Sequence, residues 1–319
     1  MRILFISSTR VGDAVLSTGL LNKVLVDHPG ARVTIACGPA AAGLFTHVPG
    51  LEQLIVLDKM VFSFHWLNMW ARTVGKFWDV IIDLRNAPLS YALLSRRRYR
   101  MVRARTSGHR IRQIANIMGL ADNPPSPKMW IGDEHRTKAL KVIADGAPVL
   151  AIGPTANWTA KTWSVDRFLE LALRLTARDG ILPGGRIAVF GRDDERPQAL
   201  RLIDAIPADR LIDLVGRVGL LDIAACFERA AFYVGNDSGL MHIAAASGIP
   251  TLGLFGPSQH EHYAPWGDKC AVAVTKVPYE KIFPENFDHR NTGTLMDSLS
   301  VDDAERAARE LWYKVEGRL

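Results

Sequence analysis

Short apolar runs alternate along the chain with segments whose apolar residues recur at helical spacing. The first half holds the predicted strands Arg2–Ser7, Arg32–Cys37, Gln53–Leu57 and Asp79–Leu84. It also holds the predicted helices Ala14–His28, Pro39–His47 and Glu134–Asp145. A near-continuous apolar run is typical of a parallel strand that is covered on both faces. The alternation therefore predicts a doubly wound α/β domain.

The same alternation restarts at Val149–Gly153, after the turn-forming residues Gly146 to Pro148. Further strands are predicted at Arg186–Phe190, Leu211–Val215, Phe232–Val234 and Thr251–Phe255. Helices are predicted at Val165–Arg178, Glu195–Ala205, Leu220–Arg229, Leu240–Ser247 and Val301–Val315. We expect two open α/β domains, 1–147 and 148–319, that face a cleft, and the last helix could pack back on the first domain.

Composition narrows the class of protein. The chain has 319 residues, of which 48% are hydrophobic and 23% are charged, as in a globular protein of two domains. No apolar run reaches the roughly 18 residues of a membrane-spanning helix, and the N-terminus predicts a core strand instead of a signal peptide. Cys37, Cys226 and Cys270 are too widely spaced for a C-x-x-C pair, so each is expected to be a small buried residue of a cytosolic protein.

Positive charge gathers in the first half of the chain. Residues 1–150 carry a net charge of +10, and residues 151–319 carry −4. Nine arginines and no acidic residue fall within 85–112. Such a span favours an acidic partner, either a phosphorylated glycolipid or the anionic inner face of the inner membrane, although it could also be a solvated basic face. Nucleic acid is disfavoured because the span offers only two tyrosines, Tyr91 and Tyr99, that could stack on bases, and no binding motif is recognisable.

The first candidate motif, Ser7 to Ala14, joins the first predicted strand to the first predicted helix. Gly12 would allow a tight turn. Asp13 falls at or near the helix N-terminus, where aspartate is a common cap. A carboxylate at the tip of a strand could equally take a proton from an acceptor hydroxyl. The segment lacks the G-x-G-x-x-G spacing of a dinucleotide fingerprint, which disfavours a nicotinamide enzyme.

A second motif, Gly153 to Trp163, follows the first strand of the second half. Its hydroxyls and backbone amides, in the region of Thr155 and Asn157, could bind an anion at a helix start. Lys161 could neutralise the charge that builds on a leaving diphosphate, or it could be an ordinary surface lysine.

A third motif, Phe190 to Glu195, ends in three acidic residues. A carboxylate at this place in such folds commonly accepts the hydroxyls of a ribose. Asp193, Asp194 and Glu195 are all candidates, and Asp193 is the preferred one. The same acids would also suit the first turn of a helix.

The most specific motif runs from Val234 to Ala246 and continues to Pro257. It predicts a strand, a turn, a helix of small residues and a further strand. An ordinary capped helix does not explain why asparagine, aspartate, serine, glycine and histidine crowd together at one strand end. The N-terminus of the helix is an electrostatic seat for a diphosphate.

Individual residues of this motif have separate expected roles. Asp237 and Ser238 could cap the helix. Gly239, followed by Leu240, would open the backbone to a ligand. His242 could be an interior histidine, or it could orient the sugar or phosphate.

One further cluster, His260-Glu261-His262, has the wrong spacing for two metal ligands on one helix face. A solvated loop without a metal is predicted there.

Taken together, the motifs resemble glycosyltransferase family 9, the ADP-heptose:lipopolysaccharide heptosyltransferases. The resemblance rests on Val11 to Ala14, Lys161 to Trp163, Asp237 to His242 and Phe255 to Pro257. It implies the GT-B type glycosyltransferase fold, in which two Rossmann-like domains face a cleft. It assigns the acceptor to 1–147 and the nucleotide sugar to 148–319. The implied reaction is an inverting transfer of a heptose from ADP-heptose to the anionic core of lipopolysaccharide, without metal or cofactor.

The resemblance also implies roles for individual residues. Asp13 is expected to be the general base, and Lys161 is expected to stabilise the leaving diphosphate. Asp237 would touch the transferred sugar, and Asp193 would hold the ribose. The expected donor-binding residues are Gly12, Thr155, Asn157, Lys161, Asp193, Asp237, Ser238, Gly239, Leu240 and His242. The acceptor-binding residues are expected from the positive charge of the span 85–112 and not from a residue-by-residue match: Arg96, Arg97, Arg98 and Arg103.

Two other functions stay open at this point. A sugar-nucleotide epimerase of the same architecture would need further acid/base residues, and the sequence offers no convincing pair. A non-catalytic binder of nucleotide sugars or glycolipids would keep the phosphate seat and would not need Asp13.

Overall fold

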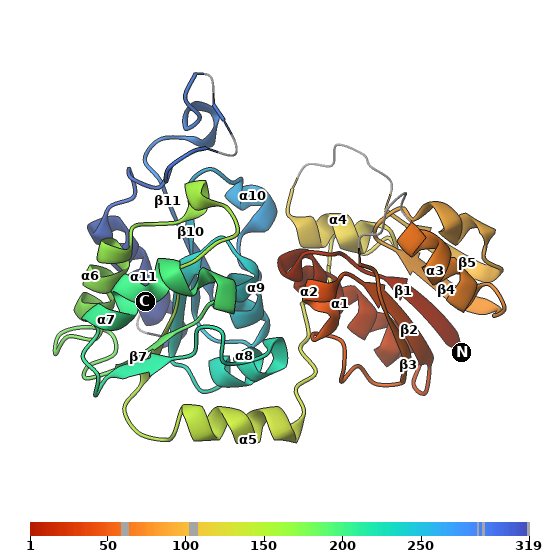
Figure 1. The fold of residues 1–319 in the computed structure, drawn as a ribbon, viewed down its shortest axis with the longest axis horizontal. Coiled ribbons are helices and arrows are strands. Elements are labelled where there is room, and N and C mark those ends of the chain that lie inside the picture. Colours follow the sequence, from red (N-terminus) through yellow and green to blue (C-terminus); the bar gives the residue numbers. More distant parts are fainter. Residues whose placement is uncertain (59–63, 102–107, 286, 289–290, 318–319) are drawn as a thin grey trace. The chain divides into compact units, whose positions relative to one another are not determined.

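Two compact α/β units make up the computed structural model, which describes residues 1–58, 64–101, 108–285, 287–288 and 291–317 (Figure 1). The first unit is Met1–Gly132 and the second is Asp133–Leu319. Each unit holds one parallel sheet with helices packed on it, so the predicted GT-B class of fold, with two Rossmann-like units, is confirmed.

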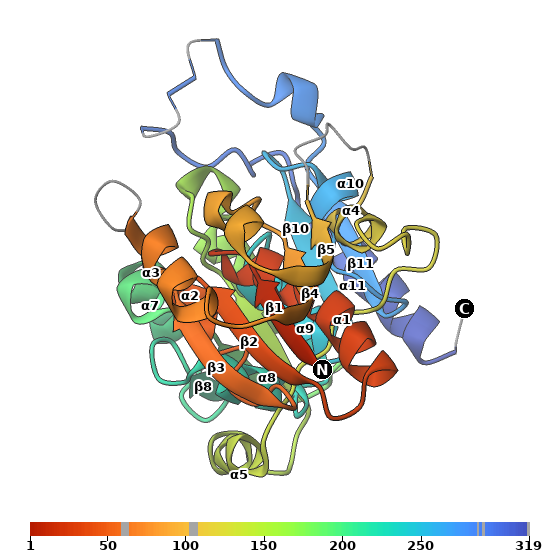
Figure 2. The ribbon, with the colours of Figure 1, turned by 90° about the vertical axis from the view of Figure 1, so that its right-hand side faces the viewer.

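The first unit, coloured red to yellow in Figure 1, holds a five-stranded sheet in the order β3-β2-β1-β4-β5. Its strands are β1 (Arg2–Ile6), β2 (Arg32–Cys37), β3 (Leu51–Val56), β4 (Trp78–Asp83) and β5 (Ser95–Arg100). Its described helices are α1 (Val11–Asp27), α2 (Pro39–Ala42), α3 (Phe64–Thr73) and α4 (Arg110–Asn116), with a 3-10 turn η2 (Pro88–Ala92). The sheet can be followed from another side in Figure 2.

Apolar residues of β1 and β4 form the centre of this unit because the strands are covered on both faces. Leu4, Ile6 and Ile81 are fully buried, and Met69 of α3 packs with them. Trp66, also on α3, is half-buried against the same cluster. This burial, at about 25 cal/mol per Å² of apolar surface, is the main force that holds α3 on the sheet.

The second unit, coloured green to blue, holds a six-stranded sheet in the order β11-β10-β9-β6-β7-β8. Its strands are β6 (Val149–Gly153), β7 (Arg186–Val189), β8 (Leu211–Asp213), β9 (Phe232–Asn236), β10 (Thr251–Phe255) and β11 (Cys270–Val274). Its described helices are α5 (Asp133–Val142), α6 (Val165–Leu175), α7 (Arg196–Ala205), α8 (Leu220–Phe227), α9 (Gly239–Ala246), α10 (His260–Tyr263) and α11 (Val301–Val315). Short 3-10 turns are η3 (Thr159–Lys161), η4 (Asp193–Glu195) and η5 (Tyr279–Lys281).

Strand order fixes where each sheet can bind a ligand. In the second unit the chain runs outward from β6 to β8 and then returns to β9 on the other side of β6. In the first unit it runs from β1 to β3 and then returns to β4 beside β1. Ligands of such sheets bind beyond the carboxyl ends of the strands at the point where the order reverses. These switch points therefore lie between β6 and β9 and between β1 and β4.

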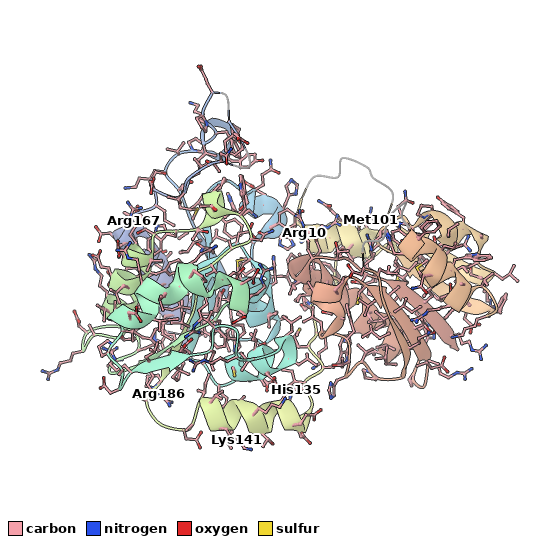
Figure 3. All side chains as sticks on the ribbon, in the orientation of Figure 1. Arg10, Met101, His135, Lys141, Arg167 and Arg186 are labelled. Atoms are coloured by element: carbon pink, nitrogen blue, oxygen red, sulfur yellow. The ribbon has the colours of Figure 1, made fainter. Side chains whose placement is uncertain are left out.

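Helix α5 joins the second unit, although the sequence placed it in domain 1–147. His135 Nδ1 lies 2.6 Å from Asp222 Oδ1 on α8, and Arg136 Nε lies 2.9 Å from Glu228 Oε2 (His135 is labelled in Figure 3). The contacts of the chain thus divide at Gly132, earlier than the predicted boundary. Helix α11 packs on α6 and on strands β10 and β11 of its own unit.

Three further details differ from the sequence-based expectations. His260-Glu261-His262 begins the short helix α10 instead of forming a loop. Cys37 and Cys226 are buried as expected, whereas Cys270 is partly exposed. The basic segment Ser95–Arg100 forms the strand β5, for which no strand was predicted. None of the helices within the described part of the chain combines the length and the apolar character that a bilayer-spanning helix needs.

Candidate active site

Asn236, the last residue of β9, joins the segments that follow the two central strands of the second unit. Its side chain is fully buried. Its Oδ1 accepts a hydrogen bond from the backbone N–H of Trp163 at 3.0 Å, and its Nδ2 donates to the Pro154 carbonyl at 2.8 Å. A buried amide with both ends bonded is a rigid connector, because either bond would leave an unpaired polar group if it broke. The loops after β6 and β9 are therefore held in one arrangement at the switch point.

Lys161, at the end of η3, forms an ion pair and hydrogen bond with Asp237, which follows β9. The side chain of Lys161 is 22% exposed and that of Asp237 is 7% exposed. The sequence left open whether Lys161 is an ordinary surface lysine. Its burial and its ion pair with Asp237 show that it is not. The pair lies beside the switch point with one face open to water.

Helix α9 begins directly after this pair. Ser238 occupies the N-cap position with an extended backbone, but its side chain does not bond any amide of the first turn. The predicted side-chain cap is thus wrong. The amides that begin with Gly239 and Leu240 keep the partial positive charge of a helix N-terminus. His242 lies one turn further along and is buried.

Tyr233 of β9 was not predicted from the sequence to be part of this site. Its ring is fully buried and runs toward the carboxyl ends of β6 and β9, where Gly153 and Gly235 are paired. A Cβ placed on Gly153 would lie 2.1 Å from the Tyr233 hydroxyl, and one placed on Gly235 would lie 2.3 Å from it. Burial raises the pKa of Tyr233, and a contact with the Ser238 hydroxyl opposes this rise. The signal in the sequence was the pair of glycines at neighbouring strand ends.

Of the three acids after β7, the structure turns Glu195 inward. Its Oε2 accepts hydrogen bonds from Thr155 Oγ1 at 2.8 Å and from the backbone N–H of Arg192 at 2.9 Å, and the side chain is buried. Asp193, the preferred candidate from the sequence, is exposed, as is Asp194. The turn η4 explains this result, because its geometry directs only the third acid toward the sheet.

The remaining predicted residues of this loop region differ in exposure. Thr155 is buried and its hydroxyl is already bonded to Glu195. Asn157 is exposed.

Asp13 lies in the first unit, at the switch point between β1 and β4. Helix α1 begins at Val11, after Arg10 (labelled in Figure 3), so Gly12 and Asp13 belong to its first turn. Asp13 lies near the helix N-terminus as expected, but Arg10 occupies the N-cap position, so the alternative that Asp13 is the cap is wrong. Asp13 Oδ1 instead accepts from Arg110 Nε, the first residue of α4, at 3.3 Å. Both side chains are about one-fifth exposed, at 20% and 22%. The carboxylate is therefore held by a neighbouring positive charge and remains accessible.

Of the four arginines predicted to bind an acceptor, three lie on the edge strand β5. Arg96 and Arg97 are exposed. Arg98 is partly buried, and its Nη2 donates to the Leu93 carbonyl. Arg103 lies outside the described residues. Charged residues on an edge strand also protect it from pairing with other chains, so their exposure alone does not define a binding site.

Comparison with known proteins identifies relatives along most of the chain. A family model described as glycosyltransferase family 9 (heptosyltransferase) matches residues 76–284. The chain is 31% identical over 291 residues to lipopolysaccharide heptosyltransferase 1 of Pseudomonas aeruginosa, covering 81% of this chain and 79% of that protein. It is 24% identical over 309 residues to lipooligosaccharide heptosyltransferase 2 of Haemophilus influenzae, covering 85% and 88% of the two chains. The solved structure of the ADP-heptose heptosyltransferase II of Escherichia coli superposes with a TM-score of 0.74 at 19% identity and covers 99% of this chain and 100% of that one.

Proposed function

Because the chain belongs to glycosyltransferase family 9, we propose that it transfers a heptose from ADP-heptose to an anionic acceptor of the lipopolysaccharide core. The chain is a glycosyltransferase, and its named relatives are heptosyltransferases of lipopolysaccharide and lipooligosaccharide. The E. coli enzyme of known structure is described as an ADP-heptose heptosyltransferase. These names support the same donor and the same class of acceptor here.

The observation that carries the proposal is the anion seat at the switch point of the second unit. Asn236 holds the loops after β6 and β9 together, Lys161 supplies a positive charge there, and α9 points its uncapped N-terminus to the same place. A diphosphate would accept hydrogen bonds from the amides near Ser238 and Gly239. Lys161 would then share its charge between Asp237 and the diphosphate.

The rest of the donor has proposed partners in the same unit. Asp237 would contact the transferred sugar. Glu195, the acid that turns inward, replaces Asp193 as our candidate for holding the ribose, because it lies beside Thr155 at the edge of the sheet. Asn157, Leu240 and His242 of this unit are retained as further candidates for donor contacts, as is Gly12 of the first unit.

The proposed chemistry is a single displacement that inverts the anomeric carbon. Asp13 takes the proton from the acceptor hydroxyl, whose oxygen forms the new bond to the anomeric carbon. The bond between that carbon and the diphosphate breaks, and the diphosphate leaves with the electron pair. Lys161 and the N-terminus of α9 stabilise the charge on the leaving group, so no metal ion is needed.

The acceptor is proposed to contact the basic first half of the chain. Arg96, Arg97, Arg98 and Arg103 would bind its anionic groups, which fits the net charge of +10 on residues 1–150. The same charge would favour peripheral contact with the anionic inner face of the inner membrane.

A thermal-shift panel of nucleotide sugars tests the donor first. A donor at about a hundredfold its Kd should stabilise the protein by about 2.7 kcal/mol. We expect ADP-heptose to raise Tm more than UDP- or GDP-sugars, and heptose to appear on a core glycolipid only when both substrates are present. Transfer should persist in EDTA, and the product linkage should have the opposite anomeric configuration to the donor. A panel in which ADP-heptose gives no shift would reject the donor assignment.

Family membership also favours transfer over epimerisation. Incubation with the nucleotide sugar alone distinguishes the two activities. Release of an epimerised sugar nucleotide without any acceptor would contradict the transferase proposal.

A further inference from the structure

Arg85 lies at the switch point of the first unit, directly after β4. The backbone N–H of Leu84 donates to the Ile6 carbonyl at 3.0 Å, and Ile6 is paired with Asp83 across the sheet. Because β1 and β4 are parallel neighbours, Arg85 emerges at the same sheet edge as the segment from Ser7 to Asp13. This is the place where open α/β sheets bind their ligands.

A buried carboxylate builds the turn that presents Arg85. Asp83 is fully buried and accepts hydrogen bonds from the backbone N–H groups of Arg85 at 3.0 Å and Ala87 at 2.8 Å, and from Ser90 Oγ at 2.7 Å. Asn86, between them, has a φ of +54°, which costs free energy in any residue other than glycine. A backbone conformation of this kind persists only where several bonds enforce it, so the direction of Arg85 is fixed.

The Arg85 side chain has almost none of the partners that a buried guanidinium normally has. It stacks over Trp66 of α3, with its Cζ 4.6 Å from the ring centroid. Its Nη1 is enclosed and has no hydrogen-bond partner, and no carboxylate among the described residues forms an ion pair with its side chain. Burial lowers the pKa of Arg85, and the charge of Asp83 opposes this only in part. Removing half of a guanidinium from water without pairing all of its N–H donors costs free energy unless an anionic group binds to it.

Asp83 does not act as the anionic partner of the Arg85 side chain. Its oxygens already accept three hydrogen bonds, and a second guanidinium, that of Arg100, lies 3.5 Å from its Oδ2. Arg100 is itself held by Asn86 Oδ1 at 2.7 Å and lies over the Tyr91 ring. One carboxylate therefore faces two guanidinium groups, and the cluster keeps one net positive charge at the sheet edge.

We propose that Arg85 is an anion-recognition residue that binds a carboxylate or phosphate group of the acceptor at the edge of the β1–β4 switch point. The identity of this ligand as the acceptor rests on the proposed function; the anion site itself rests on the geometry above. Trp66 fixes the plane of the guanidinium, and Asp83 fixes its point of attachment. The planar fork of donors suits carboxylate and phosphate groups alike.

Calorimetric titration tests the site without requiring turnover. The titrant is water-soluble core oligosaccharide from a deacylated lipopolysaccharide, in three forms: untreated, with its carboxylates methyl-esterified, and with its phosphates removed. We expect Arg85→Gln to weaken binding of the untreated form about tenfold or more, as for the loss of a hydrogen bond to a charged group. The form that lacks the group recognised by Arg85 should bind the wild type and Arg85→Gln with equal affinity. That form therefore shows whether the recognised group is a carboxylate or a phosphate.

Thermal unfolding separates recognition from a structural role. Because Arg85 is an incompletely paired cation, Arg85→Gln should leave Tm unchanged or raise it, as is common when a binding residue is removed. Arg72→Gln, which removes an exposed arginine from the same helix as Trp66, is the matched control and should change neither binding nor Tm. A clear fall in Tm of Arg85→Gln with unchanged binding would make the residue structural and would overturn the inference.

The same samples distinguish this inference from the proposed function. Equal binding by wild type and Arg85→Gln, or no binding by the wild type, rejects the anion site. Binding that depends on Arg85 in a wild-type protein that transfers no heptose rejects the proposed reaction and keeps the anion site.

Discussion

At the scale of single residues, Asp13 is the side chain on which the proposed chemistry depends. Its carboxylate is accessible, and the guanidinium of Arg110 holds it in place from α4. Asp13→Asn keeps the shape and a hydrogen-bond acceptor for Arg110 but cannot take a proton. We expect kcat to fall by about 10²- to 10⁴-fold. Transfer of radiolabelled heptose to core glycolipid measures this effect.

The matched control is Asp122→Asn, which changes an exposed acid of the same unit. It should leave kcat unchanged, and both variants should show the wild-type thermal shift with the donor. A variant Asp13→Asn with nearly normal kcat would exclude the residue as the base.

Residue types and spacing identified Asp13, Lys161 and Asp237 as candidates because each lies in a short motif at a strand end. They gave Asp193 as the preferred acid over Glu195, although a single turn of 3-10 helix decides which side chain points inward. Arg85 was only one of nine arginines in its span. Its difference from the others is a matter of burial and of partners, which sequence does not contain.

At the scale of elements, the pairing of β6 with β9 leaves no room at Gly153 for a larger residue. The Tyr233 hydroxyl would lie 2.1 Å from an added Cβ, and the next atom, Cζ, would lie 3.1 Å from it. Gly153→Ala should therefore lower the free energy of unfolding by about 1–3 kcal/mol. Tyr233→Phe removes the closest atom and should recover a large part of this loss in the double variant. Urea unfolding of the four proteins measures the coupling.

The informative control in this cycle is Tyr233→Phe alone, which removes the contact with Ser238 and keeps the ring. If the double variant were as unstable as the sum of the two single variants, the hydroxyl would not be the obstacle at Gly153.

A second prediction at this scale concerns the Asn236 connector. Asn236→Ala leaves the Trp163 N–H and the Pro154 carbonyl without their partner, at a cost of about 1–3 kcal/mol for each buried group. We expect a lower Tm and a smaller donor-induced shift, because the two loops are no longer held together. Asn236→Asp keeps the acceptor for Trp163 but sets a buried carboxylate oxygen against the Pro154 carbonyl oxygen, so it should be at least as destabilising as Asn236→Ala at neutral pH. A donor-induced rise in Tm as large in Asn236→Ala as in the wild type would show that the Asn236 connector is not needed for donor binding.

Periodicity made some elements predictable, but not all: the apolar strand β11 was missed. The strand β6 has its predicted bounds, Val149–Gly153, because its run is entirely apolar and buried. The strand β5 was missed because its sequence, SRRRYR, has no apolar alternation, and its place at the sheet edge removes the need for one. The helix α9 spans Gly239–Ala246 and so begins one residue before the predicted start at Leu240.

At the scale of the whole molecule, hydropathy predicted two α/β units but did not predict which of them contains α5. The segment Gly146 to Pro148 has the composition of a linker, and the helix before it is mostly polar. Its membership of the second unit depends on specific partners on α8, such as Asp222 for His135 and Glu228 for Arg136. Pairings between helices distant in sequence cannot be deduced from the periodicity of either one.

These contacts predict where the chain can be divided. A fragment of residues 133–319 keeps α5 on α8, whereas a fragment of residues 148–319 exposes the face of α8 that α5 covers. Burial of Asp222 raises its pKa, but the bond from His135 and the charge of Lys138 outweigh this, so its pKa lies below the ordinary value. A lowered carboxyl pKa stabilises the fold at neutral pH, and the stabilisation is lost as pH falls through the folded-state pKa. The longer fragment should therefore have the higher Tm at pH 7, and its advantage should shrink in acid. Scanning calorimetry of both fragments from pH 7 to pH 3 measures this. Equal Tm values at pH 7 would mean that α5 adds no stability to the second unit, and the boundary predicted at residue 147 would then be the better description of the folding units.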